Sequence, residues 1–126
     1  MSGVTYDTGA LIAADRDDRR IWLLHRLTLE RGVIPTVPAG VLGQSWRRGP
    51  QPRLSHLLDG CQVEGLSESL ARSAGSLLAL TGHNDLIDAS VVIGALTRDD
   101  AIVTSDRDDI ETLMSASRKR LQIIDV

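Results

Sequence analysis

Short apolar segments alternate with longer amphipathic segments along the whole chain, and this alternation constrains the fold more than any other feature. Strands are predicted over residues 4–6, 33–37, 61–66, 101–105 and 121–126. Helices are predicted from residue 8 and over residues 17–31, 39–47, 53–60, 67–80, 85–96 and 108–116, with Ser67 as an N-cap. Strands that alternate with helices form parallel sheets with right-handed crossovers, so we expect a three-layer α/β/α domain with a mostly parallel central sheet.

Length and composition bound the rest of the architecture. A chain of 126 residues has the usual size of one domain, so residues 1–126 are expected to form a single domain. Phe is absent and aromatic residues make up 2% of the chain, which predicts an aliphatic core. The single cysteine excludes an internal disulfide and a cysteine-rich zinc site. No segment is typical of a membrane span or a signal peptide, and we expect a cytoplasmic protein without a membrane partner.

Acidic residues follow the predicted strands at the points where ligands bind in open parallel sheets. Asp7 follows the first strand and Asp106 the fourth, and Asp109 lies one turn into the next helix. Asp85 and Asp88 share one face near a helix N-terminus, because they lie three residues apart. The topology therefore predicts that these carboxylates converge.

Each of these acids also has a purely structural interpretation. Asp7 and Asp106 are typical N-cap residues, while Asp85 and Asp109 would favour the positive end of a helix dipole. Several converging carboxylates repel one another, however, and need a cation or a raised pKa. A hard divalent cation with oxygen ligands meets that need best, so we expect Mg²⁺, with Mn²⁺ as an alternative. The three histidines lack the spacing of a zinc motif.

Three ordered motifs resemble those of PIN-domain ribonucleases, specifically the VapC-like toxins of toxin–antitoxin pairs. They are Asp7-Thr8-Gly9-Ala10-Leu11, Asp88-Ala89 at the start of a helix, and Thr104-Ser105-Asp106 with Asp109. The resemblance extends over essentially the whole chain. It implies catalytic acids at Asp7, Asp88, Asp106 and Asp109, the first three of them metal ligands, with support from Thr104 and Asp85.

One position departs from that family pattern. The family usually carries a glutamate on the helix after the second strand, and this chain has Gln44 there. An amide oxygen can accept a hydrogen bond from a bound water, but it brings no charge and cannot act as a base. Weaker metal binding is the expected consequence.

The resemblance also implies an endoribonuclease that acts on structured RNA, forms a homodimer and is neutralised by a cognate antitoxin. The formal net charge of −3 gives no overall attraction to nucleic acid, so RNA contacts would depend on local basic groups or on a metal. Arg47, Arg48 and Arg53 surround a Gly/Pro-rich break and are candidate RNA contacts. A simple solvated loop is the alternative interpretation of these arginines.

Two other functions fit parts of the sequence. A catalytically weakened PIN-like module that binds RNA or a protein is favoured by Gln44. A phosphate-accepting receiver-like domain also clusters acids at strand ends, but it needs a lysine after the last strand, and Lys119, the only lysine, precedes that strand. His83 is interpreted as a turn residue, and Trp46 as a core or dimer contact.

Overall fold

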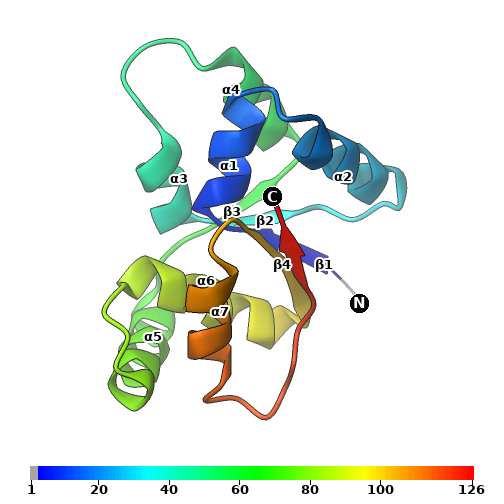
Figure 1. Ribbon diagram of the computed structural model, residues 1–126. Coiled ribbons are helices and arrows are strands. Elements are labelled where there is room, and N and C mark those ends of the chain that lie inside the picture. The colour runs from blue at the N-terminus through cyan, green and yellow to red at the C-terminus, as the bar shows by residue number, and fades with distance from the viewer. Residues whose placement is uncertain (1–2) are drawn as a thin grey trace.

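A five-stranded parallel sheet forms the middle layer of the molecule (Figure 1). The computed structural model describes residues 3–126. The strand order is β3-β2-β1-β4-β5, and every neighbouring pair is parallel. The strands span Gly3–Tyr6 (β1), Thr36–Pro38 (β2), Gln62–Glu64 (β3), Asp100–Thr104 (β4) and Ile123–Asp125 (β5). The expected α/β/α fold is confirmed, and β1, from the start of the chain, occupies the centre of the sheet.

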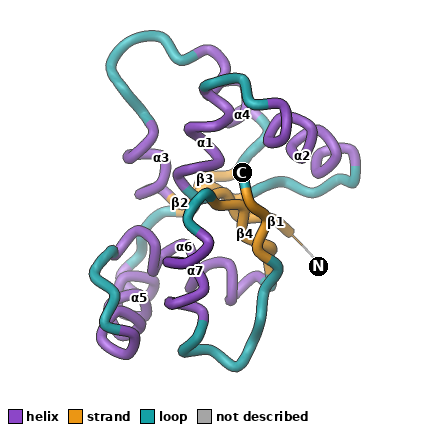
Figure 2. The backbone as a smooth tube through the Cα atoms, in the orientation of Figure 1, coloured by secondary structure: helices purple, strands orange, loops and turns teal. Residues whose placement is uncertain are grey.

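Helices cover both faces of this sheet (Figures 1 and 2). One layer contains α1 (Thr8–Asp15), α2 (Arg19–Glu30), α3 (Ala39–Ser45) and α4 (Pro52–Asp59). The other layer contains α5 (Glu68–Thr81), α6 (Leu86–Arg98) and α7 (Arg107–Met114). Ser67 caps α5 as expected, because its side chain accepts a hydrogen bond from the backbone N–H of Leu70 at 3.1 Å.

The core is aliphatic apart from Tyr6 and Met114. All five residues of β4 are buried, as expected for a strand covered by helices on both faces. The hydroxyl of Tyr6 lies 2.8 Å from Nδ1 of His25, so this buried phenol has a polar partner. Across residues 3–126, no helix combines the length and the apolar character that crossing a membrane requires.

Several element boundaries differ from the predicted ones by a few residues. The second strand begins at Thr36 rather than at residue 33, because Ile34 is exposed and Pro35 has no N–H to donate to a ladder. Helix α3 ends at Ser45, and Trp46 follows in an extended conformation with 48% of its surface exposed. The expectation that Trp46 lies in the core is therefore wrong, while its role as a dimer contact stays a prediction.

Candidate active site

The acids that follow β1 and β4 lie next to each other because these strands are parallel neighbours. The hydroxyl of Thr104, the last residue of β4, donates a hydrogen bond to Oδ2 of Asp7 at 2.7 Å. The same hydroxyl accepts the backbone N–H of Asp106 at 2.9 Å. Thr104 thus links the two loops that carry the first and third motifs.

The start of α1 fixes the other oxygen of Asp7. Oδ1 of Asp7 accepts the backbone N–H of Thr8 at 2.8 Å, which makes Asp7 the N-cap of α1. This turn lies tightly against the end of β4. A Cβ atom added to Gly9 would lie 2.7 Å from Cβ of Ser105 and 2.9 Å from its backbone nitrogen. Glycine therefore allows the close approach of the two acidic loops.

Asp88 is held in the first turn of α6 by the cap of that helix. Oδ1 of Asp85 accepts the backbone N–H groups of Ile87 at 2.9 Å and of Asp88 at 3.0 Å. Asp85 is consequently the N-cap of α6, and the same residue lines the acidic cavity described below. The structural and functional interpretations of Asp85 are compatible, since one carboxylate has two oxygens.

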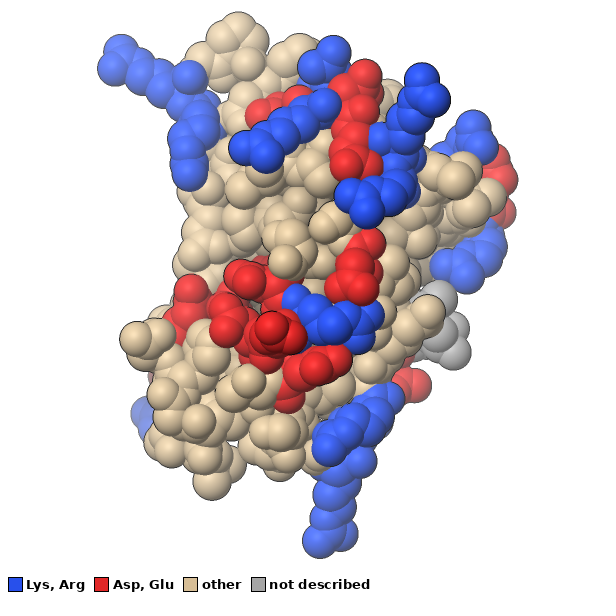
Figure 3. Space-filling view, viewed as in Figure 1, with Lys and Arg blue, Asp and Glu red and all other residues tan. Residues whose placement is uncertain are grey.

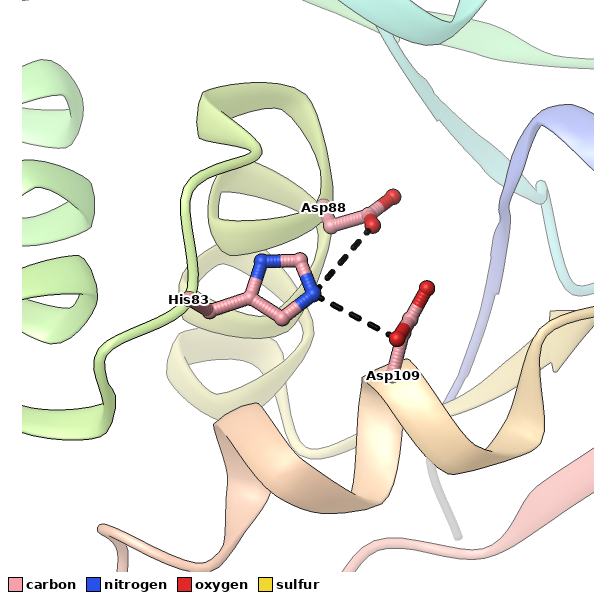
Figure 4. Close-up of side chains that lie close together, drawn as sticks. All are labelled: His83, Asp88 and Asp109. Atoms are coloured by element: carbon pink, nitrogen blue, oxygen red, sulfur yellow. Dashed lines mark ion pairs between the residues drawn. The ribbon is translucent and has the colours of Figure 1, made fainter.

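His83, in the loop before α6, points toward two of the acids (Figure 4). Its Nε2 lies 3.5 Å from Oδ1 of Asp109, in the first turn of α7, and 3.9 Å from Oδ2 of Asp88. From the sequence alone, His83 is expected to be only a turn residue. Its position within a short run that also holds Asp85 and Asp88 was the available signal.

Gln44 reaches the site from α3. The hydroxyl of Thr8 donates a hydrogen bond to Oε1 of Gln44 at 2.5 Å. This contact fixes the amide beside the N-terminus of α1, at the place where the family pattern has a carboxylate.

All these side chains except Thr104 line one open cavity of about 490 Å³. Its lining is Asp7, Thr8, Gly9, Ile12, Gln44, His83, Asn84, Asp85, Asp88, Ser105, Asp106 and Asp109. A larger cavity of about 690 Å³ lies between α2 and α4, where Trp22 stacks on His56. We assign the candidate site to the smaller cavity, because five carboxylates line it.

Neither a protein-family profile nor a curated protein sequence matches the chain. Solved structures do match it. VapBC2 from Rickettsia felis, bound to a DNA fragment from its promoter, matches with a TM-score of 0.74 at 14% identity over 98% of both chains. The chain has a VapC-like PIN fold.

Two further structures share this PIN fold. DNA-bound VapBC from Salmonella typhimurium matches with a TM-score of 0.69 at 17% identity, over 99% of this chain and 98% of the other. PAE2754 from Pyrobaculum aerophilum matches with a TM-score of 0.64 at 19% identity, over 98% of this chain and 90% of the other.

The surroundings of this PIN-fold site raise the pKa values of two of its carboxyl groups, Asp88 and Asp7. Burial, together with the negative charges of Asp7 and Asp85, raises the pKa of Asp88 to about 7. Burial also raises the pKa of Asp7, although hydrogen bonds from Thr104 and Thr8 oppose the increase. Oxygen ligands that are crowded in this way fit a hard divalent cation, which would replace the protons.

The three candidate RNA-binding arginines lie apart from the carboxylates. Arg47 and Arg48 are exposed in the loop between α3 and α4, and Arg53 of α4 forms an ion pair with Asp17 at 3.9 Å. None of the three is among the residues that line the acidic cavity. Figure 3 shows the acidic side chains gathered over α6 and α7, with basic groups above them at the α3–α4 loop.

Lys119 does not approach the acids of the PIN-fold site. Its ammonium group lies 3.3 Å from Asp99 and donates to the carbonyl of Leu96 at 3.3 Å, near the opposite ends of the strands. This position provides no support for a receiver-like phosphate site. The adjacent Arg120 donates to carbonyl oxygens of Met114 and Ser117 at the end of α7, which is a capping role.

Proposed function

We propose that this PIN domain is a metal-dependent endoribonuclease that acts in the cytoplasm as the toxin of a toxin–antitoxin pair. The observation that carries the proposal is the convergence of Asp7, Asp88, Asp106 and Asp109 from three segments of the chain onto one open cavity. The likeness of the fold to VapBC structures supports the toxin assignment.

Asp7, Asp88 and Asp106 are the proposed metal ligands, and Asp109 completes the acidic set. When bound, Mg²⁺ or Mn²⁺ would supply positive charge for phosphate oxygens and acidify a water molecule for in-line attack on phosphorus. Thr104 orients Asp7 through its 2.7 Å hydrogen bond, and Asp85 orients the backbone of Asp88. Several carboxylates surround the cavity, so a strand of RNA would need a cation there to lower the repulsion between phosphate and site.

The proposed partners of the domain follow from the same assignment. A cognate antitoxin would cover the acidic cavity, and a homodimer would be the functional assembly. Arg47 and Arg48, exposed at the α3–α4 loop, are proposed to bind RNA phosphates. Arg53 is a weaker candidate, because Asp17 already pairs with it.

A non-catalytic PIN-like module that binds RNA or protein is the second candidate. Gln44 favours it, because the amide occupies the cavity where a further carboxylate would strengthen metal binding. The two candidates differ in one measurable property, namely whether the purified protein breaks phosphodiester bonds.

RNA cleavage by the purified protein tests the proposal. The protein, free of any antitoxin, is incubated with a mixture of structured RNAs in Mg²⁺, Mn²⁺ or EDTA. Cleavage should require the metal and should disappear in Asp7→Ala and Asp109→Asn. Asp108→Asn is the matched control, because Asp108 is an exposed acid in the same first turn of α7 but does not line the cavity.

Expression of the protein in a bacterial host provides a second test of the proposed function. The unmodified chain should arrest growth, and Asp7→Ala and Asp88→Ala should not. Binding of RNA without cleavage in any metal, together with normal growth, would favour the non-catalytic module.

A further inference from the structure

His83 is a partly buried residue to which the proposed reaction gives no role. Only 13% of its side-chain surface is exposed. Its Nδ1 accepts the backbone N–H of Asp85 at 3.1 Å. A backbone amide can only donate, so Nδ1 must present its lone pair, and a neutral ring then carries its proton on Nε2.

That protonated nitrogen faces two carboxylates from different helices. Nε2 lies 3.5 Å from Asp109 of α7 and 3.9 Å from Asp88 of α6 (Figure 4). One ligand atom from each of the three side chains lies within 4.8 Å of the others, a spacing that also suits a shared cation. The hydrogen bond from the backbone N–H of Asp85 to Nδ1 decides between proton donation and metal binding at Nε2. It keeps the ring proton on Nε2, and a nitrogen that carries a proton has no lone pair for a metal.

We propose that His83 is a positioning residue that donates its Nε2 proton toward Asp109 and Asp88, and that it does not bind the metal itself. This inference rests on the proposed nuclease site. The side chain of Asp109 is 48% exposed, against 13% for Asp88, so Asp109 gains most from a fixed donor. By holding α6 and α7 acids toward a common point, His83 preserves a metal-binding arrangement in which Gln44 contributes no charge.

Nitrogen-15 NMR of the histidine rings tests the tautomer directly and requires no activity. Spectra of the purified protein are recorded at pH 8 with EDTA and again with saturating Mg²⁺. The His83 signals are assigned by their loss in His83→Gln, while His25 and His56 serve as internal references. We expect a bare Nδ1 and a protonated Nε2 in both samples. A protonated Nδ1, or loss of the Nε2 proton when Mg²⁺ is added, would overturn the proposal.

Two substitutions separate the two ring nitrogens. Gln places an amide N–H close to the position of Nε2, whereas Asn places an amide oxygen close to the position of Nδ1. Loss of a group that orients a metal ligand typically weakens metal affinity by about 10- to 100-fold. We therefore expect calorimetric Mn²⁺ affinity to fall by about tenfold or more in His83→Asn and to stay within about threefold of the unmodified protein in His83→Gln.

The other outcomes have distinct meanings. If His83 were a metal ligand, both variants would lose affinity. If it only anchored the loop through Asp85, Asn would restore affinity and Gln would not. Either result contradicts the proposal. Failure of the unmodified protein to cut RNA would refute the proposed function alone, since the NMR and Mn²⁺ measurements do not depend on cleavage.

Discussion

At the scale of single residues, Gln44 is the position where this chain departs most clearly from the family pattern. Its amide lies in the acidic cavity and accepts a hydrogen bond from Thr8. A glutamate carboxylate at position 44 would accept the same hydrogen bond from Thr8. Replacing the amide by a carboxylate therefore changes the charge of the side chain and hardly changes its shape.

Gln44→Glu should tighten Mn²⁺ binding, because the substitution adds a negative oxygen ligand or water acceptor to the cavity. Titration calorimetry measures the change. Gln122→Glu is the matched control, since Gln122 is exposed and does not line this cavity, yet the substitution adds the same charge. An unchanged or weakened affinity in Gln44→Glu would mean that position 44 does not act on the metal.

The raised pKa of Asp88 predicts how stability depends on pH when no metal is present. The folded protein keeps a proton on Asp88 up to a pKa of about 7, whereas the unfolded chain releases it near 4. The folded state therefore binds more protons between these values, and its stability falls as pH rises through that window. Each unit of pKa difference corresponds to about 1.4 kcal/mol.

Urea unfolding in EDTA at pH 5 and pH 8 measures this effect. The unmodified protein should lose more stability over that interval than Asp88→Asn, which cannot ionise. Equal losses would show that Asp88 has an ordinary pKa in the folded protein. The measurement needs EDTA, since a bound cation would favour the ionised carboxylate.

At the scale of elements, the sequence predicted the acidic site better than it predicted His83. The ends of parallel strands meet at one edge of a sheet, so Asp7 and Asp106 could be brought together from the strand pattern alone. The contact between His83 and Asp109 joins a loop to a helix that packs beside it, and no local periodicity encodes such a pair. The first and last residues of β2 could not be predicted from the sequence either, because they depend on which backbone N–H and C=O groups form hydrogen bonds with the neighbouring strands.

The packing of α1 against the end of β4 depends on Gly9, because a side chain at this position would collide with Ser105. Gly9→Ala should lower the free energy of unfolding by about 1–3 kcal/mol through overpacking. It should also weaken Mn²⁺ binding, since the added methyl group separates Asp7 from Asp106. Denaturant unfolding and calorimetry measure the two effects.

Gly75→Ala is the control for that substitution. Gly75 lies within α5, and no heavy atom outside its own helical surroundings lies within 4 Å of a Cβ added there. Ala should stabilise the helix by about 1 kcal/mol and leave Mn²⁺ affinity unchanged. A Gly9→Ala variant that behaved like Gly75→Ala would argue against the tight packing of the two acidic loops.

At the scale of the whole molecule, the net charge of −3 is modest, but the charged side chains are distributed unevenly over the surface. Acidic groups gather at the site and basic groups lie around it (Figure 3). Concentrated negative charge opposes folding when it is not compensated, and a cation that binds only the folded state removes that cost.

Addition of Mn²⁺ should therefore raise the thermal unfolding temperature. At about 100 times the dissociation constant the stabilisation is about 2.7 kcal/mol, which corresponds to several degrees for a domain of this size. Differential scanning fluorimetry with and without EDTA measures the shift. Asp88→Ala should lose it and Asp108→Asn should keep it, whereas a shift of equal size in both variants would point to a cation bound elsewhere.

The pairing of β1 with β4 also sets when the site comes into existence during protein synthesis. Asp7 leaves the ribosome early, but its partner Thr104 lies 97 residues further along the chain. At about 5–20 residues per second, translation needs about 5–20 s to reach it. Until then the nascent chain lacks the central pair of strands and cannot assemble the acidic cavity. Under the RNA-cutting function proposed above, this order would keep the growing polypeptide harmless to the messenger and the ribosome that are producing it.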